Sequence, residues 1–337
     1  MLVHAVHDRA LSARVIRRVA MRYAEGPDPA LDRPPYVRAA SGIAWLGSEL
    51  AVIQDDANFI AIVDPATGLA RSTALPAGAG GRRLFDDSRG NKAEKLDHEA
   101  LVAVADGGDT LLVALGSGST PRRETIVLIQ QYSASHHAAR AIAAPRFYAA
   151  LRAAAFFAGS ELNVEGATYL DGRLRLFGRG NGAVVGTTRP VNATCDIDWA
   201  GLRAHLEQQT LAPPVPTNVV QYDLGSIDGI ELSFTDATPG GAGHRASETV
   251  FYTAAAEASP DATRDGVVAG SAIGVIETID GTLTARWTEL RDAGGGRFPL
   301  KAEGIALTST PGRLLIVADV DAHDRPSELL EVQLDGA

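Results

Sequence analysis

Short runs of alternating apolar and polar residues, separated by turns, recur along most of this 337-residue chain. The first four runs are Val37–Leu46, Leu50–Gln54, Phe59–Asp64 and Leu69–Leu75. A period of two predicts β-strands, and the Gly, Pro, Asn and Asp residues between the runs mark turns. Helical periodicity is confined to two insertions, Pro145–Phe157 and Trp199–Gln209. The pattern therefore predicts an all-β protein.

Five of the predicted strands open with similar segments. They read Ser41-Gly-Ile-Ala-Trp, Glu99-Ala-Leu-Val-Ala, Glu165-Gly-Ala-Thr-Tyr, Asp228-Gly-Ile-Glu-Leu and Glu303-Gly-Ile-Ala-Leu. A turn and a second apolar run follow each segment, and the opening residues are 58, 66, 63 and 75 positions apart. A repeat of short strands at roughly this spacing is typical of sheets arranged radially around an axis.

We therefore expect one domain, a five-bladed β-propeller; a six-bladed ring is the alternative. The expected blades are about 37–75, 99–143, 165–224, 228–290 and 303–334. The last unit lacks its outer strand because the chain ends there. The N-terminal run at about 13–22 has no other place, so we expect it to complete the last blade and close the ring. Closure of this kind removes an exposed sheet edge.

The repeat also predicts a metal site, because the same polar position in every unit converges on the axis. The predicted ligands are Ser41, Glu99, Glu165, Asp228 and Glu303. Several carboxylates cannot share a desolvated axis without a cation. Oxygen ligands without cysteine select Ca²⁺ over Zn²⁺ or Cu²⁺. The alternative is that backbone N–H groups or the neighbouring Lys95 and Lys301 satisfy these carboxylates.

The loops expected at the same end of the axis carry basic and amide side chains. Those predicted to bind a ligand are Lys92, Lys95, Arg122, Arg123, Arg179, Asn181 and Lys301. Arginine suits bidentate recognition of phosphate or carboxylate, so we expect a small anionic ligand. The alternative is that these cations only neutralise the axial carboxylates.

Composition and charge narrow the class of protein. The net charge of −10 argues against general binding to nucleic acid and to anionic membranes. The single cysteine, Cys195, cannot form an intrachain disulfide. The N-terminus has no continuous apolar segment typical of a secretory signal, so we expect a cytoplasmic protein, or an extracytoplasmic one if a leader was removed. The sequence leaves the oligomeric state open.

With these motifs in view, the chain resembles calcium-binding β-propellers, above all the calcium-activated nucleotidase (apyrase) family. Ser41, Glu99, Glu165 and Glu303 match the inner-strand Ser and Glu residues that hold Ca²⁺ in that family, whereas Asp228 stands where a small hydroxyl residue is expected. The Ser-Gly-Ile and Glu-Gly-Ile segments, with Gln54-Asp55-Asp56, also resemble esterase-like phytase propellers. The chain as a whole resembles a bacterial propeller family related to both groups.

The resemblance covers the inner two strands of each unit, about a third of the chain, and implies an axial Ca²⁺ and a five-bladed fold. For function we expect a Ca²⁺-dependent hydrolase of a phosphate ester or anhydride, in which Glu99 or Asp55 orients water. The alternatives are a non-catalytic propeller that binds an anionic ligand or acts as a scaffold, and a lactonase- or esterase-like hydrolase. The sequence does not decide between an enzyme and a binding protein.

Overall fold

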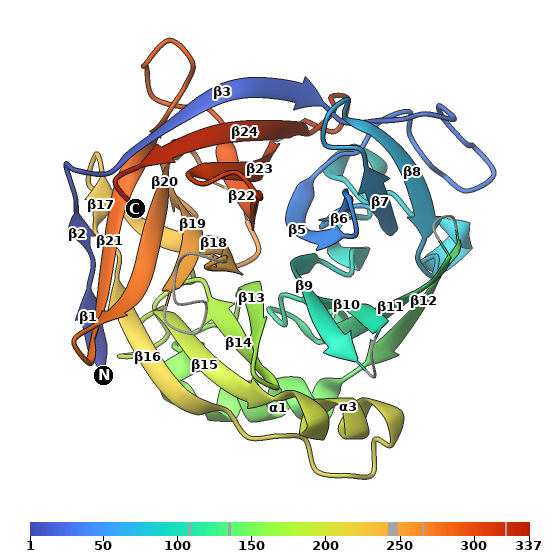
Figure 1. Ribbon diagram of the computed structural model, residues 1–337. Helices are drawn as coiled ribbons and strands as arrows, with labels where there is room; N and C mark the ends of the chain where they lie inside the picture. The colour runs from blue at the N-terminus through green and yellow to red at the C-terminus, as the bar shows by residue number, and fades with distance from the viewer. Residues whose placement is uncertain (107–108, 134–135, 242–248, 265, 321) are drawn as a thin grey trace.

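The inner strands of the computed structural model surround a central axis, and their sheets radiate outward from it (Figure 1). The structure describes residues 1–337 except 107–108, 134–135, 242–248, 265 and 321. The innermost strands are β5 (Ala40–Leu46), β9 (His98–Asp106), β13 (Val164–Leu170), β18 (Ile230–Pro239) and β22 (Lys301–Leu307). Each packs against the next along the chain, and β22 packs against β5. The all-β class predicted from the alternating pattern is confirmed.

Three sheets begin at β5, β9 and β13 and add antiparallel strands outward. From β5 follow β6 (Glu49–Gln54), β7 (Phe59–Val63) and β8 (Leu69–Ala74). From β9 follow β10 (Asp109–Gly116), β11 (Thr125–Ser133) and β12 (His136–Ala143). From β13 follow β14 (Arg173–Gly178), β15 (Asn192–Asp198) and β16 (Thr217–Asp223).

The remaining strands form one larger sheet that contains two four-stranded groups. One group is β18, β19 (Thr249–Glu257), β20 (Val268–Ile279) and β21 (Thr282–Arg291), with β17 (Ser226–Ile227) paired to β18. The other is β22, β23 (Arg313–Asp319), β24 (Glu328–Asp335) and β3 (Ser12–Ala20). A short parallel pairing between β21 and β3 joins the two groups.

The N-terminal segment lies along the outer edges of several sheets (Figure 1, blue). β3 pairs antiparallel with β24 over eight residue pairs, so the run expected at 13–22 is a strand at the edge of the last group. The pattern did not predict that β1 (Leu2–His4), β2 (Val6–His7) and β4 (Arg22–Tyr23) add in parallel to β16, β21 and β8. Pairing along these edges covers N–H and C=O groups that would otherwise be open to another chain.

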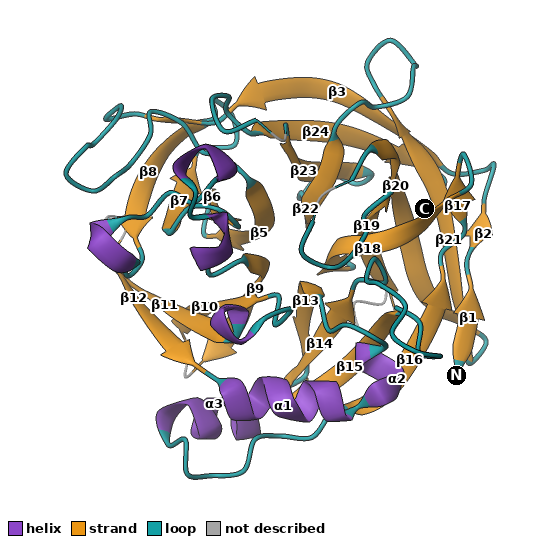
Figure 2. Ribbon diagram, turned by 180° about the vertical axis from the view of Figure 1, so that it is seen from behind, coloured by secondary structure: helices purple, strands orange, loops and turns teal. Residues whose placement is uncertain are grey.

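The helical insertions lie at the periphery (Figure 2). They are α1 (Pro145–Ala153), α2 (Ala155–Ala158) and α3 (Trp199–Glu207), so both expected helical regions are confirmed. α1 begins at Pro145, a residue favoured in the first turn, and buries Phe147, Tyr148 and Leu151. None of the helices in the described part of the chain is long and apolar enough to cross a membrane.

The core lies between neighbouring sheets, because most strands are buried on both faces. β7 is buried along its whole length, and its Ile60 and Ile62 share a cluster with Leu112 and Val127 of the next sheet. Burying one such side chain contributes about 1.5–3 kcal/mol. This packing fixes the orientation of the sheets and leaves their innermost ends free to present polar groups at the axis.

Candidate functional site

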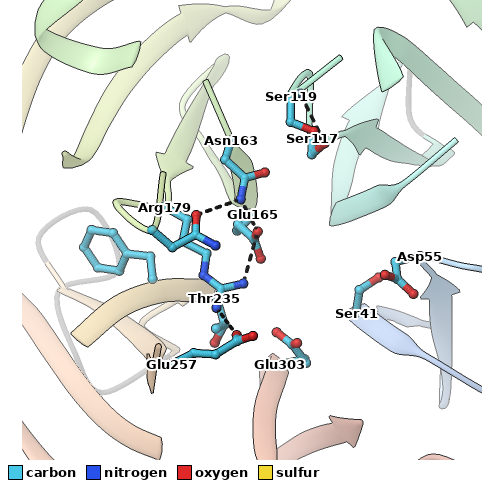
Figure 3. A network of polar contacts seen from close by, with 12 residues as sticks. Ser41, Asp55, Ser117, Ser119, Asn163, Glu165, Arg179, Thr235, Glu257 and Glu303 are labelled. Atoms are coloured by element: carbon cyan, nitrogen blue, oxygen red, sulfur yellow. Dashed lines mark hydrogen bonds and ion pairs between the residues drawn. The ribbon is translucent and has the colours of Figure 1, made fainter. Parts of the chain in front are cut away.

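Each of the five inner strands has a β-bulge at the residue that faces the axis. In β13, Val164 pairs with Gly178 and Gly166 with Phe177, which leaves Glu165 without a cross-strand partner. The register shifts in the same way at the corresponding point of each of the other inner strands. The residues at these shifts are Ser41 with Gly42, Glu99, Glu165, Thr235, and Glu303 with Gly304. A bulge bends a strand and re-aims one side chain, which explains how these groups converge; Figure 3 shows Ser41, Glu165, Thr235 and Glu303.

The prediction that Asp228 is an axial ligand is wrong. It lies in the turn between β17 and β18 at φ 52°, where its side chain is 62% exposed and forms an ion pair with Arg297. Asp228 is not part of the axial pocket. Thr235, seven residues further along, takes the bulged position instead. It supplies the small hydroxyl residue that the resemblance to the nucleotidase family implied.

The hydroxyl residues Ser41 and Thr235 are held in the same way. Ser41 Oγ donates to the carbonyl of His98 at 2.7 Å, and Thr235 Oγ1 donates to that of Ala302 at 2.7 Å. Each acceptor precedes the axial glutamate of the next inner strand. A hydroxyl that donates its proton to the backbone still has lone pairs free to accept a hydrogen bond or bind a cation.

A pocket of about 550 Å³ opens over four of the residues at the bulges, Ser41, Glu99, Glu165 and Glu303; Thr235 is not among its lining residues. Among the described residues, nine carboxylates and seven basic side chains line it, so their formal charges sum to −2 when all are ionised. The carboxylates belong to Asp55, Asp56, Asp86, Asp87, Asp97, Glu99, Glu165, Glu303 and Asp319. The basic residues are Arg38, Lys92, Lys95, Arg123, Arg179, Arg264 and Lys301. A net negative charge in a partly desolvated pocket favours a bound cation.

On one side of the pocket, Lys95 is placed among three carboxylates. Its Nζ lies 2.5 Å from Asp55 Oδ2 and 2.7 Å from Asp97 Oδ1. Arg123 Nη1 contacts the other oxygen of Asp97 at 2.8 Å. Ligand atoms of Asp55, Asp97 and Glu99 all lie within 4.8 Å of one another, a spacing that can hold a metal ion. Because Lys95 already contacts two of these carboxylates, a metal ion bound among them would have to displace its ammonium group.

On the other side, Arg179 bridges two carboxylates (Figure 3). Its Nη2 lies 2.5 Å from Glu257 Oε2, and its Nη1 lies 3.4 Å from Glu165 Oε1. Lys301 Nζ contacts Glu303 Oε1 at 2.8 Å and Glu257 Oε2 at 3.4 Å. All five side chains are nearly buried, so each ion pair has little competition from water. Glu257, which carries no repeat signature, therefore belongs to the site.

The pKa values of the buried carboxyl groups in the site shift in opposite directions. Burial raises the pKa of Glu99 well above its usual range, and the charges of Glu165, Asp97 and Asp55 add to the shift. Burial likewise raises the pKa of Glu303 to about 8, although Lys301 opposes the shift. The pKa of Glu257 falls to about 2, because Lys301 and Arg179 outweigh the effect of burial. In the absence of a further cation, burial therefore favours the protonated forms of Glu99 and Glu303.

Two buried carboxylate oxygens, Glu303 Oε2 and Asp55 Oδ1, have no hydrogen-bond partner among the described residues. Buried polar atoms normally have partners, so these oxygens indicate a ligand that the side chains do not supply. The donor set consists of carboxylate and hydroxyl oxygens with no thiol, which fits a hard divalent cation such as Ca²⁺. The residues present therefore fit the predicted metal.

Most of the predicted ligand-binding residues line the pocket, but Arg122 does not. Lys92, Lys95, Arg123, Arg179, Asn181 and Lys301 are among the lining residues. Arg122 is exposed on the short 3-10 helix Pro121–Arg123 and is absent from the pocket wall. Asn181 accepts a hydrogen bond from Asn163 Nδ2 at 3.2 Å, and that amide also contacts Glu165.

Sequence reasoning missed a group at the rim of the pocket. Arg38, only 3% exposed, lies 2.5 Å from Asp56 Oδ2 and 3.1 Å from Asp86 Oδ2. Burial and the adjacent charge of Asp55 raise the pKa of Asp56 to about 6, against the effect of Arg38. Arg38 lies three residues before Ser41, within the first predicted strand, and that position was the only available signal.

The chain belongs to the family of unknown function DUF6929, whose model matches residues 36–334. Among solved structures, it is similar to Myxococcus xanthus glutaminyl cyclase, with 12% identity, 99% of each chain covered and a TM-score of 0.48. For a GH43 β-1,3-galactosidase the identity is 8%, the covered shares are 94% of this chain and 93% of that chain, and the TM-score is 0.45. The calcium structure of a Trichoderma reesei family AA12 enzyme is 11% identical, with 97% of this chain and 96% of that chain covered and a TM-score of 0.42. A search of the curated proteins finds no match. Similarity at this level carries no argument about activity.

Proposed function

We propose that this protein is a five-bladed β-propeller whose axial site binds one divalent cation, with Ca²⁺ the first candidate. The proposed ligands are the carboxylates of Glu99, Glu165 and Glu303, with the hydroxyl oxygens of Ser41 and Thr235 beside them. When bound, the ion would polarise an oxygen atom of a ligand in the pocket above it.

The observation that carries the proposal is the buried, unpartnered Oε2 of Glu303 in a pocket where carboxylates outnumber cations. Glu303 is only 5% exposed, so water cannot solvate its carboxylate freely. A divalent ion would offset the excess of negative charge among the described lining residues and give this oxygen a partner. Protonation of the carboxyls is the competing way to relieve the charge, and it weakens as the pH rises.

Calorimetric titration of chelator-stripped protein with CaCl₂ and MgCl₂ tests the cation site. We expect one Ca²⁺ per chain and weaker binding of Mg²⁺, which demands near-octahedral geometry. Glu165→Gln keeps the shape of the side chain but removes its charge, so it should abolish or strongly weaken binding. Asp228→Asn is the matched control and should bind as the wild type does. Absence of Ca²⁺ heat, with no ion retained by the stripped protein, would sink the proposal.

The proposed fivefold arrangement is supported by the closed sequence of inner-strand contacts and by β3, which gives the last group its fourth strand. Deleting residues 1–22 should expose the edge of β24 and promote self-association through that strand. Size-exclusion chromatography with light scattering would detect this change. A truncated protein that stays monomeric and equally stable would contradict the assignment of β3 as the closing strand.

For catalysis we propose the hydrolysis of a small phosphate ester or anhydride, with Glu99 or Asp55 as the group that orients water. Each of the seven basic residues in the described part of the pocket wall contacts a carboxylate. An anion can therefore be held only if the ion competes for those carboxylates and releases cations such as Arg179 and Lys301. Anion binding should accordingly depend on Ca²⁺.

The lining favours a compact ligand over a nucleotide. Among the described lining residues, none has an aliphatic side chain larger than Ala, and His323 has the only aromatic ring. A nucleobase would find no apolar surface on which to stack. Assaying phosphate release from a panel of small phosphoesters, with and without Ca²⁺, tests this reading. Ca²⁺-dependent binding without turnover would favour the non-catalytic alternative.

A further inference from the structure

The residue after the axial position differs in one of the five inner strands. It is Gly42, Gly166 and Gly304 in three of them and Ala100 in a fourth, whereas β18 has Asp236. A carboxylate therefore stands where the repeat otherwise has a very small residue. Nothing in the proposed cation site uses it.

The glycines are needed because neighbouring inner strands nearly touch at this level. A Cβ atom on Gly304 would lie 2.7 Å from Ile43 N, and one on Gly166 would lie 2.9 Å from Asp236 Cα. Both distances are shorter than a carbon side chain tolerates against backbone. The side chain of Asp236 can be present only because it is accommodated in contact with the next strand.

That contact is a hydrogen bond to the strand that carries Glu303. Asp236 is fully buried, and its Oδ2 accepts from Ile305 N at 2.9 Å. Its Oδ1 has no partner among the described residues. Ile305 lies two residues beyond Glu303, at the far side of the bulge in β22.

The near side of this bulge is held by Thr253 of β19, the strand after the one that carries Asp236. Thr253 Oγ1 donates to the carbonyl oxygen of Glu303 at 2.6 Å. Pairing between β22 and β23 is interrupted between Ala302 and Ile305, so the ladder does not fix the backbone there. The bulge that presents Glu303 is thus held from β18 and β19.

We propose that Asp236 is a positioning residue for the axial site: its carboxylate anchors Ile305 N and so fixes the bulge that points Glu303 at the axis. The role in cation binding rests on the proposed function. The anchoring contact itself does not depend on a bound ion, and it can be measured in metal-free protein.

Two substitutions separate this role from mere space filling. Asp236→Asn keeps an oxygen acceptor of the same shape, whereas Asp236→Ala removes the acceptor and leaves a methyl group that Ala100 shows to be tolerated at this level. In metal-free protein, we expect Asp236→Ala to speed amide exchange at Ile305 by about tenfold or more, as loss of one buried hydrogen bond implies. Asp236→Asn should leave that exchange close to the wild-type rate.

The second readout is the Kd for Ca²⁺ by calorimetry. Asp236→Ala should raise it by about tenfold, again the effect of one lost hydrogen bond. Asp236→Asn should restore the wild-type Kd. In a Glu303→Gln background, the same Ala substitution should add little, because the carboxylate that it misplaces is already gone.

The inference would be overturned if the Ile305 amide in Asp236→Ala exchanged at the wild-type rate, or if that variant bound Ca²⁺ with the wild-type Kd. It would also be overturned if Asp236→Asn failed to restore the wild-type exchange rate and Kd. If the Ala variant does not fold, the Asn variant decides: a Kd raised as much as by Glu303→Gln overturns the inference. If the wild type binds no divalent ion, the proposed function fails and with it the role of Asp236 in cation binding. The exchange rate then still decides whether the anchor exists.

Discussion

Ser41 and Thr235, on inner strands that are not neighbours, make the same hydrogen bond: each donates its hydroxyl to the carbonyl that precedes the axial glutamate of the next strand. The two side chains therefore occupy equivalent places in the repeat. With Glu99, Glu165 and Glu303 they complete one polar residue for each inner strand. A set of three carboxylates and two hydroxyls is chemically suited to Ca²⁺.

Replacing Thr235 should affect both stability and cation binding. Thr235→Ala leaves the carbonyl of Ala302 without its buried donor, and we expect a loss of about 1 kcal/mol in the free energy of unfolding. Thr235→Ser keeps the hydroxyl and should restore most of the stability and the Ca²⁺ affinity. Urea denaturation and calorimetry measure the two effects. Equal affinity in the Ala variant and the wild type would remove Thr235 from the ligand set.

Arg179 should be among the most sensitive positions in the chain. It is nearly buried between Glu165 and Glu257, so Arg179→Ala leaves charged groups without compensation. We expect a loss of about 3–5 kcal/mol in the metal-free protein, measured by urea denaturation. Arg71→Ala is a control, because that arginine pairs with Glu49 at the surface, where ion pairs contribute about 0–1 kcal/mol. Similar losses at both positions would argue against a buried network.

Binding of Ca²⁺ should strengthen as the pH rises toward 8. Burial raises the pKa of Glu303 from its ordinary value of 4.5 to about 8. Between these values the folded, metal-free protein holds a proton that the unfolded chain has lost, so stability from this group falls with rising pH and is lost above about 8. An ion must displace that proton, which lowers its affinity about tenfold for each unit below pH 8.

Calorimetry at pH 6, 7, 8 and 9 measures this dependence. Glu303→Gln has no proton to lose at that position and should show a flatter profile, whatever its absolute affinity. A wild-type affinity that does not vary between pH 6 and 8 would mean that Glu303 is already ionised in the folded protein.

Close approach of the inner strands can be tested at Gly304. Its Cβ would lie 2.7 Å from Ile43 N, so Gly304→Ala must push two backbones apart. We expect a loss of about 1–3 kcal/mol, the usual effect of overpacking. Gly294→Ala is the control, because the nearest atom to its Cβ is a side-chain oxygen at 3.4 Å. Equal melting temperatures for the two variants would contradict the close packing at the axis.

Local patterns were enough to predict the strands and most of the axial residues. Alternation marked the strands because their side chains face neighbouring sheets, and the Glu-Gly segments marked Glu165 and Glu303 because a bulge beside a close backbone contact requires glycine. Asp228-Gly229 has the same acidic-residue–glycine pattern, but it forms a turn and not a bulge. Both residues have positive φ, as a tight hairpin turn demands.

Apart from Lys301, which was named as a possible partner and contacts Glu303, the partners of the axial residues could not be predicted from the sequence. Arg179 and Glu257 are 78 residues apart, and Lys95 and Asp55 are 40 apart. Their contacts arise only when separate sheets meet at the axis. The sequence pattern did not identify Thr235, because Asp236 follows it at the position where most of the other inner strands have glycine. Asp236 accepts a hydrogen bond from Ile305 N, which accounts for this exception.

The most direct test of the central claim is the melting temperature of chelator-stripped protein across a Ca²⁺ titration, with Mg²⁺ and the Glu165→Gln variant as controls. A cation that binds only the folded state stabilises it by about 2.7 kcal/mol at 100 times its Kd. We predict a Ca²⁺-selective rise in the wild type that continues with concentration and is lost in the variant. No rise in protein verified as metal-free, or an equal rise in Glu165→Gln, would contradict an axial cation site.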